Sequence, residues 1–336
     1  MKQKHLSKNL EVSAIGLGRM GLSHGYGPAL DDAEAIRLIQ TSVDDLGYTL
    51  IDTAETYGYA GRPHVNEELV GRALKGARRE RVKIVTKFGI HFDYEHDSAP
   101  YPLHLDSRPQ TIRASVEGSL KRLGTDHIDL YLQHRIDPNV EPEEVASTMA
   151  ELIAEGKVLN WGISEASEGY LRRAHAVCPV AAIENRYSMM ARWHESLFPT
   201  LEELGIGFIA FSPLANGFLT GAVTKGDAAS FDPATDYRAS MPQFDADAID
   251  KNQALTDFLA ALAARHDATP AQVSLAWMCC KKPYIVPIPG SRHLDRLAQN
   301  AAAGDIELSA DEVAAIDAAL DSMDMSDVFG GSKAAK

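Results

Sequence analysis

The stretch from Thr49 to Lys87, TLIDTAETYGYAGRPHVNEELVGRALKGARRERVKIVTK, has the pattern that best indicates the fold. It begins and ends with short runs that favour β-structure, Thr49–Asp52 and Val82–Lys87, and between them Asn66–Lys75 has the amphipathic pattern of a surface helix. Both runs are almost continuously apolar, which is typical of parallel strands buried on both faces. We therefore expect a strand, a helix and a second strand parallel to the first.

The same alternation extends outward to both ends of the chain. Further strands are expected at Ser13–Leu17, Ile128–Gln133, Val158–Ile163, Ala181–Asn185, Phe208–Phe211 and Ile285–Ile288. Further helices are expected at Asp31–Leu46, Ser107–Leu123, Glu141–Glu155, Glu168–Val177, Glu195–Leu204, Pro270–Cys280 and His293–Ala302. Strict alternation of eight such units predicts an α/β fold, a closed (β/α)8 TIM barrel.

Two connections are too long to be turns: Phe88–Ser107 after the third strand and Pro213–Asp250 after the seventh. Long loops in a compact domain commonly carry function. Ser309–Leu320 predicts one extra helix at the C-terminal end, and residues 325–336 are expected to form a flexible tail. We expect residues 1–336 to form a single barrel domain.

Composition limits the possible partners. The 336 residues include 33 Lys and Arg against 47 Asp and Glu, a formal net charge of −14. This balance argues against a nucleic-acid partner, because affinity for a phosphate backbone comes from clustered Lys and Arg. A small anionic cofactor needs only a local basic pocket and stays possible. Three cysteines without CxxC spacing, and the absence of an apolar leader or apolar span, predict a cytoplasmic protein without a membrane partner.

The segment Gly16-Leu17-Gly18-Arg19-Met20-Gly21 matches the GxGxxG pattern of dinucleotide-binding loops. In that fingerprint the third glycine opens a helix, so that the pyrophosphate meets the helix N-terminus. Here the next helix is expected only near Asp31. A glycine-lined loop at the rim of the barrel is therefore the better interpretation.

The loop after the third strand contains side chains that could bind a metal ion: His91, Asp93, Glu95, His96, Asp97 and His104. Metal ligands must converge on one point, whereas a polar loop of this composition is usually solvated. We expect no metal site, with a metal-dependent barrel hydrolase left as an alternative.

Polar residues at the C-terminal ends of the strands form the strongest candidate site, because barrel enzymes place their catalytic groups there. Asp52, Lys87 and His134 end or follow three successive strands, and Tyr57 lies in the loop after the first of them. The ammonium of Lys87 is expected to lower the pKa of Tyr57, with Asp52 orienting Lys87. Tyr57 can then protonate a carbonyl oxygen that His134 positions. The hydride must come from a reduced nicotinamide.

With these residues in place, the chain resembles the aldo-keto reductases along nearly its whole length. The matching motifs are Gly16–Gly21, Ile51–Gly58, Asn66–Gly71, Val85–Lys87, Asp129–Arg135, Trp161–Ser164, Phe211–Leu214, Pro287–Arg292 and Asn300. The resemblance implies a catalytic tetrad of Asp52, Tyr57, Lys87 and His134, with Tyr57 as the general acid and base.

The resemblance also implies an NADP(H) site. Ser164 would meet the nicotinamide carboxamide, Phe211 would stack on the nicotinamide ring, and Arg292 and Arg296 would hold the adenosine end and its 2′-phosphate. The full set of implied contacts is Gly18, Met20, Ser164, Glu184, Phe211, Ser212, Leu214, Gly290, Ser291, Arg292, Arg296, Gln299 and Asn300. Independently, Arg292, His293 and Arg296 form a basic patch at a helix start, which favours an anion.

Four residues depart from the family pattern. Glu165 stands where Asn is usual, Glu184 replaces Gln, Arg186 replaces an acid, and Arg19 replaces a small residue. Glu184 can accept a hydrogen bond from an amide but donates one only when it is protonated. A compensating exchange between Glu184 and Arg186 is one interpretation.

These features together predict an NADPH-dependent oxidoreductase that reduces an aldehyde or ketone to an alcohol. The alternatives are a cofactor-binding regulatory subunit with little turnover and the metal-dependent hydrolase. Tyr26, Phe88 and Trp193 are candidate walls of the substrate pocket because they lie in expected rim loops, as do Phe218 and Tyr237.

Overall fold

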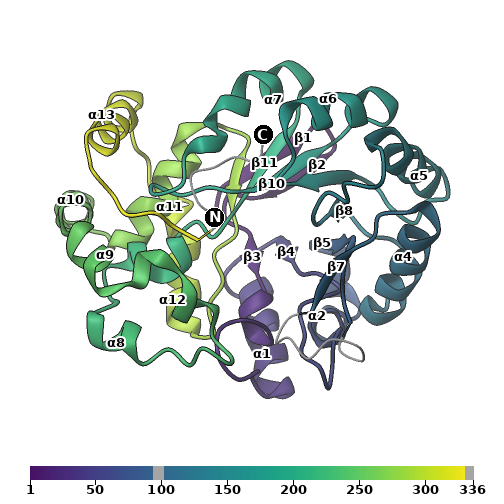
Figure 1. Cartoon of the computed structure of the whole chain (residues 1–336), viewed down its shortest axis with the longest axis horizontal. Coiled ribbons are helices and arrows are strands. Elements are labelled where there is room, and N and C mark those ends of the chain that lie inside the picture. Colours follow the sequence, from purple (N-terminus) through teal and green to yellow (C-terminus); the bar gives the residue numbers. More distant parts are fainter. Residues whose placement is uncertain (94–101, 330–336) are drawn as a thin grey trace.

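The computed structural model describes residues 1–93 and 102–329, and a curled eight-stranded parallel sheet forms its centre (Figure 1). The sheet order is β3-β4-β5-β8-β9-β10-β11-β12, which follows the chain. The strands are β3 (Leu17–Gly18), β4 (Leu50–Asp52), β5 (Lys83–Phe88), β8 (Leu130–Gln133), β9 (Trp161–Ser164), β10 (Ala182–Arg186), β11 (Gly207–Phe211) and β12 (Ile285–Pro287). The predicted (β/α)8 barrel is confirmed.

Glycines allow the first and last strands of the sheet to approach each other. The backbone N–H of Gly16 donates to the Pro287 carbonyl at 2.9 Å, and that of Gly18 donates to the Pro289 carbonyl at 3.4 Å. A Cβ on Gly18 would lie 2.5 Å from the Ile288 carbonyl oxygen, and one on Gly290 would lie 2.6 Å from the Gly18 carbonyl oxygen. Any side chain at Gly18 or Gly290 would therefore push the seam of the barrel apart.

Helices surround the sheet close to the expected positions. They are α1 (Asp32–Asp44), α2 (Val65–Ala73), α3 (Ala77–Glu80), α4 (Pro109–Leu123), α5 (Pro142–Ala154), α6 (Glu168–Val177), α7 (Phe198–Leu204), α11 (Pro270–Lys281), α12 (Leu294–Ala303) and the C-terminal α13 (Ala310–Asp321). The Asp31 side chain caps α1, and Ser309 forms a capping box with Glu312 at α13. Such caps satisfy N–H groups that the first helical turn leaves free.

An N-terminal hairpin closes the lower end of the barrel, which is the end where the parallel strands begin. It consists of β1 (Gln3–Ser7) and β2 (Leu10–Ser13), which pair antiparallel. Its apolar side chains, Leu6, Leu10 and Val12, pack against the residues that fill the barrel interior. The predicted strand at Ser13–Leu17 was misplaced, because the first residue belongs to this hairpin and only Leu17 to the barrel.

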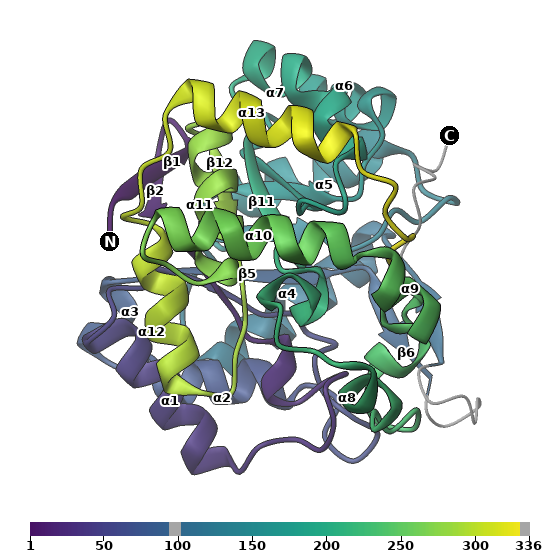
Figure 2. The same ribbon diagram turned by 90° about the vertical axis from the view of Figure 1, so that its left-hand side faces the viewer.

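The two long connections contain structure that the sequence did not indicate. The first forms a hairpin of β6 (Ile90–Phe92) and β7 (Leu103–Leu105). The second and the chain after it contain α8 (Lys225–Ala229), α9 (Ala246–Lys251) and α10 (Gln253–Arg265), which contacts α11 (Figure 2). Short 3-10 helices lie at Met20–Leu22, Trp193–Leu197, Ala215–Thr220, Tyr237–Ser240 and Pro242–Phe244.

The first residues of the expected tail contact the body of the protein. Ser326 accepts a hydrogen bond from the Asn252 side chain, and the N–H of Phe329 donates to Gln243. Residues 330–336 lie outside the described residues. The single domain stays a prediction. In the described part of the chain, no helix is both long and apolar enough to cross a membrane.

Candidate active site

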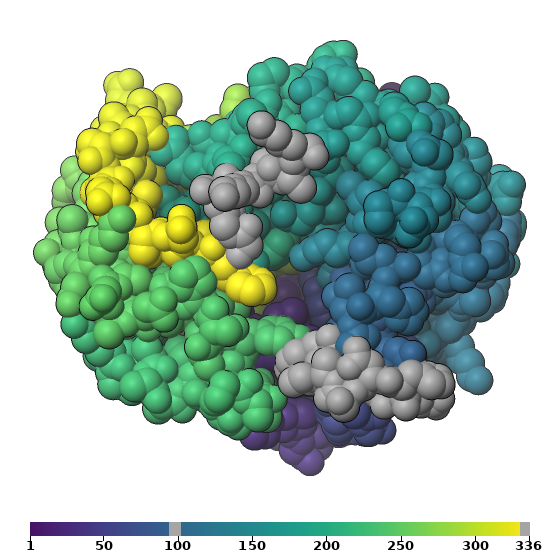
Figure 3. Space-filling model, viewed as in Figure 1, coloured from purple at the N-terminus to yellow at the C-terminus, as the bar shows by residue number. Residues whose placement is uncertain are grey.

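The alternation of side chains along each strand places the candidate residues inside the barrel at its upper end, where the strands finish. In the lower part of the interior, Leu50, Val85 and Ala182 pack together on β4, β5 and β10. Side chains two residues apart leave the same face of a strand, so Asp52, Lys87 and Glu184 stand one layer above. Figure 3 shows this face of the molecule hollowed near its centre, with N-terminal residues in purple at the bottom.

Lys87 is the centre of this layer. Its Nζ donates to Asp52 Oδ2 at 2.5 Å and to the Thr53 carbonyl at 2.9 Å, and it lies 3.3 Å from Glu184 Oε1. Asp52, Lys87 and Glu184 are all buried, with no more than 3% of each residue exposed. No described residue donates a hydrogen bond to Glu184 Oε2. One ammonium thus faces two carboxyl groups in a site that water hardly reaches.

This balance of charges shifts the pKa values of all three groups. Burial alone would lower the pKa of Lys87, but Asp52 and Glu184 outweigh it and keep the ammonium charged. Burial raises the pKa of both carboxyl groups, and the nearby Asp52 raises that of Glu184 further. Because two neighbouring buried carboxylates disfavour ionisation of both, Asp52 and Glu184 form an acid pair that favours retaining a proton.

Tyr57 and His134 lie beside this layer. Lys87 Nζ is 5.1 Å from the centre of the Tyr57 ring, and the rings of Tyr57 and His134 meet edge to face at 5.7 Å. The pKa of Tyr57 is raised, because burial outweighs the lowering by Lys87 and the two carboxyl groups add to the effect of burial. Lys87 lowers this pKa, as expected, but burial makes the net shift upward. Burial also holds the pKa of His134 well below its ordinary value, so the imidazole is neutral.

The upper rim of the barrel holds a second group of side chains. Ser164 ends β9 and is buried, and its Oγ accepts a hydrogen bond from Arg135 Nη1 at 3.1 Å. Phe211 ends β11 and is half-buried, with the guanidinium of Arg186 over its ring at 4.9 Å. The structure thus brings these rim residues together above Lys87.

A sequence model of the Aldo/keto reductase family matches residues 14–321. The chain belongs to the aldo-keto reductase family. The Probable aldo-keto reductase 1 of Glycine max is 38% identical over 327 residues, which cover 97% of this chain and 89% of that protein. Members of the family are oxidoreductases of small molecules that generally bind a nicotinamide cofactor.

Solved structures of related proteins share the fold. A glycerol dehydrogenase from Gluconobacter oxydans has a TM-score of 0.83 and 27% identity, covering 95% of this chain and 94% of that one. The holo form of an aldo-keto reductase from Bacillus halodurans has a TM-score of 0.75 and 25% identity, covering 95% of this chain and 96% of that one.

In this aldo-keto reductase, the residues expected at the adenosine end of the cofactor gather around the start of α12. Arg292 donates to the carbonyl oxygens of Gly21, Pro28 and Gly27, so its guanidinium fixes the rim loop after β3. Arg296 is exposed one turn further along the helix. The remaining residues of this set are Ser291, half-buried, Gln299, exposed, and Asn300, buried.

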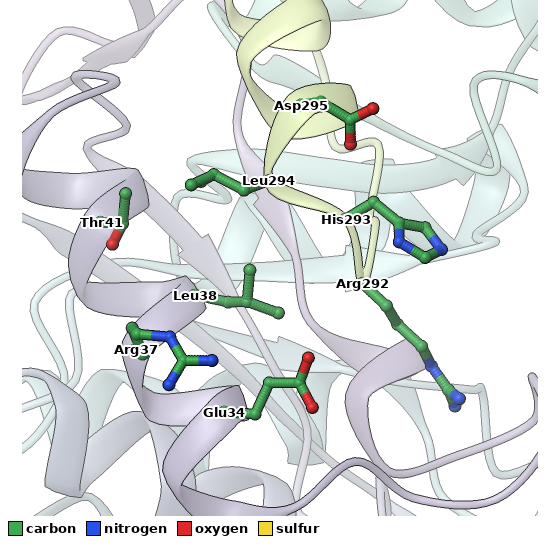
Figure 4. Close-up of a pocket in the computed structure, with 8 residues that line it drawn as sticks. All are labelled: Glu34, Arg37, Leu38, Thr41, Arg292, His293, Leu294 and Asp295. Carbon is green, nitrogen blue, oxygen red and sulfur yellow. The ribbon is translucent and has the colours of Figure 1, made fainter.

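A crevice of about 400 Å³ lies between α1 and this helix start (Figure 4). Glu34, Arg37 and Leu38 line it from α1, and His293 and Asp295 line it from the α12 side. Its charges are mixed, so the crevice itself indicates no particular ligand.

Arg19, which stands where the family usually has a small residue, is a buried cation in the structure. It is 1% exposed, and its Nη2 donates to the Ser291 carbonyl at 2.9 Å. Its Nε and Nη1 have no hydrogen-bond partner among residues 1–93 and 102–329. Burial lowers the pKa of Arg19 to about 10. A buried guanidinium with unmet N–H groups beside Ser291 fits an anionic ligand such as a dinucleotide phosphate.

The loop after β11 has an unusual backbone. Ser212, Ala215 and Asn216 all have positive φ angles, of 49°, 47° and 60°. Glu165, directly after β9, also has a positive φ, of 58°. Non-glycine residues rarely adopt this conformation, and such strain concentrates at functional sites. Leu214 lies in the same loop and Met20 in the short helix after β3, both half-buried.

The candidate substrate residues differ in their outcome. Phe88 is wrong as a rim residue, because it lies in β5 next to the inward-facing Lys87, is fully buried and packs against the Tyr131 ring at 4.8 Å. The hydroxyl of Tyr26 accepts a hydrogen bond from Asn216 at 2.6 Å, and Trp193 lies beside His194. Phe218 packs against Phe244 within its own loop.

The polar loop after the third barrel strand shows no metal cluster in its described part. His91 and His104 face each other across the β6–β7 hairpin with ring centres 5.3 Å apart. Among the described residues, no group of three His, Cys, Asp or Glu side chains could hold a metal ion. Glu95, His96 and Asp97 lie outside the described residues.

His24 is a site residue that sequence reasoning missed. Its ring stacks with that of Tyr57 at 6.1 Å, its Nδ1 lies 2.6 Å from the Gly58 carbonyl, and its Nε2 lies 2.7 Å from the Tyr237 hydroxyl. His24 therefore buttresses Tyr57 from the side of the glycine-rich loop. The sequence did contain a signal for His24, because the glycine-rich loop that precedes it was already expected at the rim of the barrel.

Proposed function

We propose that this chain is an NADPH-dependent reductase of aldehydes or ketones, in which Tyr57 acts as general acid and base. The observation that carries the proposal is the convergence of Asp52, Lys87, Tyr57 and His134 at the mouth of the barrel. A positioned acid beside a carbonyl typically contributes about 10²- to 10⁴-fold to the rate.

The raised pKa of Tyr57 suits the reductive direction. A neutral phenol can give its proton to the carbonyl oxygen, and the phenolate that remains is stabilised by the ammonium of Lys87. Asp52 holds Lys87 in place through the 2.5 Å ion pair. His134, neutral because it is buried, donates a hydrogen bond that orients the carbonyl.

The chemistry that the cofactor supplies when bound is hydride transfer to the carbonyl carbon. Ser164 and Phe211 would hold the nicotinamide end, and Arg296 with Ser291 the adenosine end. The buried guanidinium of Arg19 supports this assignment, because its unmet N–H groups suit a phosphate oxygen.

One comparison tests the mechanism. NADPH consumption is followed by its near-ultraviolet absorbance with a panel of aldehydes and ketones, for the wild type and for Tyr57→Phe. We expect turnover in the wild type and a loss of about 10²- to 10⁴-fold in the variant, with NADPH affinity retained. Undiminished turnover by Tyr57→Phe would sink the mechanism, and hydrolysis that needs no NADPH and is blocked by EDTA would replace it with metal chemistry.

The preference for NADPH over NADH is a separate part of the proposal. Arg296 is exposed at the start of α12, where the helix N-terminus also favours an anion. Replacing Arg296 by Gln should weaken NADPH binding by about tenfold and leave NADH binding nearly unchanged. We also propose a cytoplasmic location, supported by three free cysteines.

A further inference from the structure

Arg186 occupies a position that strand geometry aims at the mouth of the barrel. It ends β10, two residues after Glu184, so both side chains leave the same face of the strand. Glu184 reaches Lys87 inside the barrel. Arg186 therefore points inward one layer higher, above the groups proposed to do the chemistry.

The guanidinium of Arg186 is buried and forms no ion pair with any residue that the structure describes. The residue is 8% exposed, and within residues 1–93 and 102–329 its guanidinium makes neither a hydrogen bond nor an ion pair. It lies over the ring of Phe211, its register partner on β11, at 4.9 Å and over that of Phe329 at 5.4 Å. A guanidinium that stacks on aromatic faces keeps its N–H groups free in its own plane, where they match a carboxylate or phosphate.

Arg135 adds a second cation to the same place. Its Nη1 donates to Ser164 Oγ at 3.1 Å and to the His134 carbonyl at 2.6 Å, and its guanidinium lies 5.8 Å from the centre of the Phe211 ring. No carboxylate of the described chain forms an ion pair with it. Arg135 thus connects Arg186 with His134, the residue beside which the substrate carbonyl is expected.

The nearby carboxylate of Glu165 offsets part of this positive charge, since it raises the pKa of Arg186, but among the described residues it forms an ion pair with neither guanidinium. Its Oε1 accepts a hydrogen bond from the backbone N–H of Arg186 at 2.7 Å and lies 3.5 Å from His194 Nε2. The guanidinium groups of Arg186 and Arg135 therefore have a single carboxylate near them, and that carboxylate already contacts a backbone N–H and His194. Leaving a buried charge without a partner is costly, so a bound anion would stabilise the arrangement.

We propose that Arg186 and Arg135 bind the anionic group, a carboxylate or a phosphate, of a small carbonyl substrate. The proposal rests on the carbonyl reductase function proposed above, and it names the substrate class. The carbonyl lies at Tyr57 and His134, and the acid group of the same molecule lies at the arginine pair.

A matched pair of substrates tests this inference: para-carboxybenzaldehyde and its methyl ester, which differ in charge and little in size. We expect the wild type to prefer the acid by about 10- to 100-fold in kcat/KM. Arg186→Gln should bring that ratio close to one, whereas Arg186→Lys should keep part of it, since the charge stays but the fork of N–H groups is lost. The control is Arg173→Gln, an exposed arginine of α6 paired with Glu141 and Glu143, which should keep the wild-type ratio.

The proposal is overturned if the wild type reduces both compounds equally well or if Arg186→Gln keeps the preference. It is also overturned if Arg186→Gln weakens NADPH binding as much as it lowers the ratio, because the anion would then belong to the cofactor. Binding of benzoate against benzamide, measured by calorimetry, separates the two proposals. If no carbonyl is reduced but benzoate still binds more tightly in an Arg186-dependent way, the anion site stands and the reductase function fails.

Discussion

Two clusters in this barrel have the same kinds of ionisable group and different surroundings. Inside the barrel, Lys87 faces Asp52 and Glu184. Outside it, between the strands and helices α2 and α4, Arg122 faces Glu55 and Glu67. Each cluster sets one cation against two carboxyl groups.

The difference lies in how fully the carboxyl oxygens are bonded. In the outer cluster, Glu67 accepts hydrogen bonds from Arg122 at 2.5 Å and from the Thr86 hydroxyl at 2.6 Å, and Glu55 accepts one from Ser115 at 3.2 Å. In the inner cluster, Glu184 Oε2 receives no hydrogen bond from the described chain, and the Tyr57 ring lies alongside. The outer cluster therefore joins elements together. The inner cluster retains a carboxyl oxygen, Glu184 Oε2, that can still accept a hydrogen bond.

The largest effect should come from removing the inner cation. Lys87→Met leaves the phenolate of Tyr57 without its counter-charge, so we expect kcat for carbonyl reduction to fall by about 10²- to 10⁴-fold. Steady-state kinetics measure the loss, and thermal unfolding verifies that the variant is folded. A kcat within tenfold of the wild type would contradict the role given to Lys87.

Removing the outer cation should act on stability instead. Arg122→Met leaves two carboxyl groups without their cation, and we expect a loss of about 3 kcal/mol in the free energy of unfolding. The loss belongs at the lower end of the range for buried pairs, because the Arg122 side chain is 17% exposed. Urea unfolding measures it. If kcat of the folded fraction also fell by more than about tenfold, the two clusters would not be distinct in function.

The outer cluster should also make stability depend on pH. Burial, and then Glu67, raise the pKa of Glu55 from 4.5 to about 8, against the opposing effects of Ser115, Arg122 and the Gly89 N–H. Between these pH values the folded protein keeps a proton that the unfolded chain has lost, so stability falls as pH rises, by at most about 1.4 kcal/mol per pH unit.

Glu55→Gln should remove this contribution, because the amide has the shape of the protonated acid and does not ionise. Melting temperatures of the two proteins, measured from about pH 5 to 8, should therefore converge at low pH and diverge at high pH, with the variant more stable. Parallel curves over the whole range would show that Glu55 is ionised in the folded protein.

The smallest effect is expected from Glu184→Gln. When Glu184 ionises, its charge raises the pKa of Tyr57 and makes the phenol a poorer acid, so wild-type reduction should slow as pH rises through the raised pKa of Glu184. Gln cannot ionise, and the variant should lose this decline, which we expect to be less than about tenfold. Glu184→Asp serves as the control that keeps a carboxyl group. A decline that is the same in Glu184→Gln would assign it to another group.

The fold could be predicted because its signals are local. Apolar runs such as Val82–Lys87 and starts such as Asp31 and Ser309 specify strands and helices from neighbouring residues alone. The first strand was misplaced because Ser13–Leu17 joins the end of the hairpin to the start of β3. The alternation of residues along a strand does not reveal such a change of sheet.

The site could be predicted only as far as strand ends determine it. Asp52, Lys87 and His134 follow from their positions on successive strands, whereas the roles of His24 and Arg186 depend on contacts with distant segments. The sign of the Tyr57 shift could not be predicted either, since it depends on burial and on Glu184, which approaches from the opposite side of the barrel. The prediction that Phe88 lines the substrate pocket was wrong because its side chain lies on the outer face of β5.

The hairpin of β1 and β2 closes one end of the barrel. Leu6, Leu10 and Val12 pack with the residues that fill the lower end of the barrel, so we expect any ligand of Lys87 to enter and leave at the mouth. When two molecules enter a site through one opening, the one that lies deeper has to bind first and is released last. If the proposed cofactor and substrate both bind above Lys87, we therefore expect them to bind and leave in a fixed order.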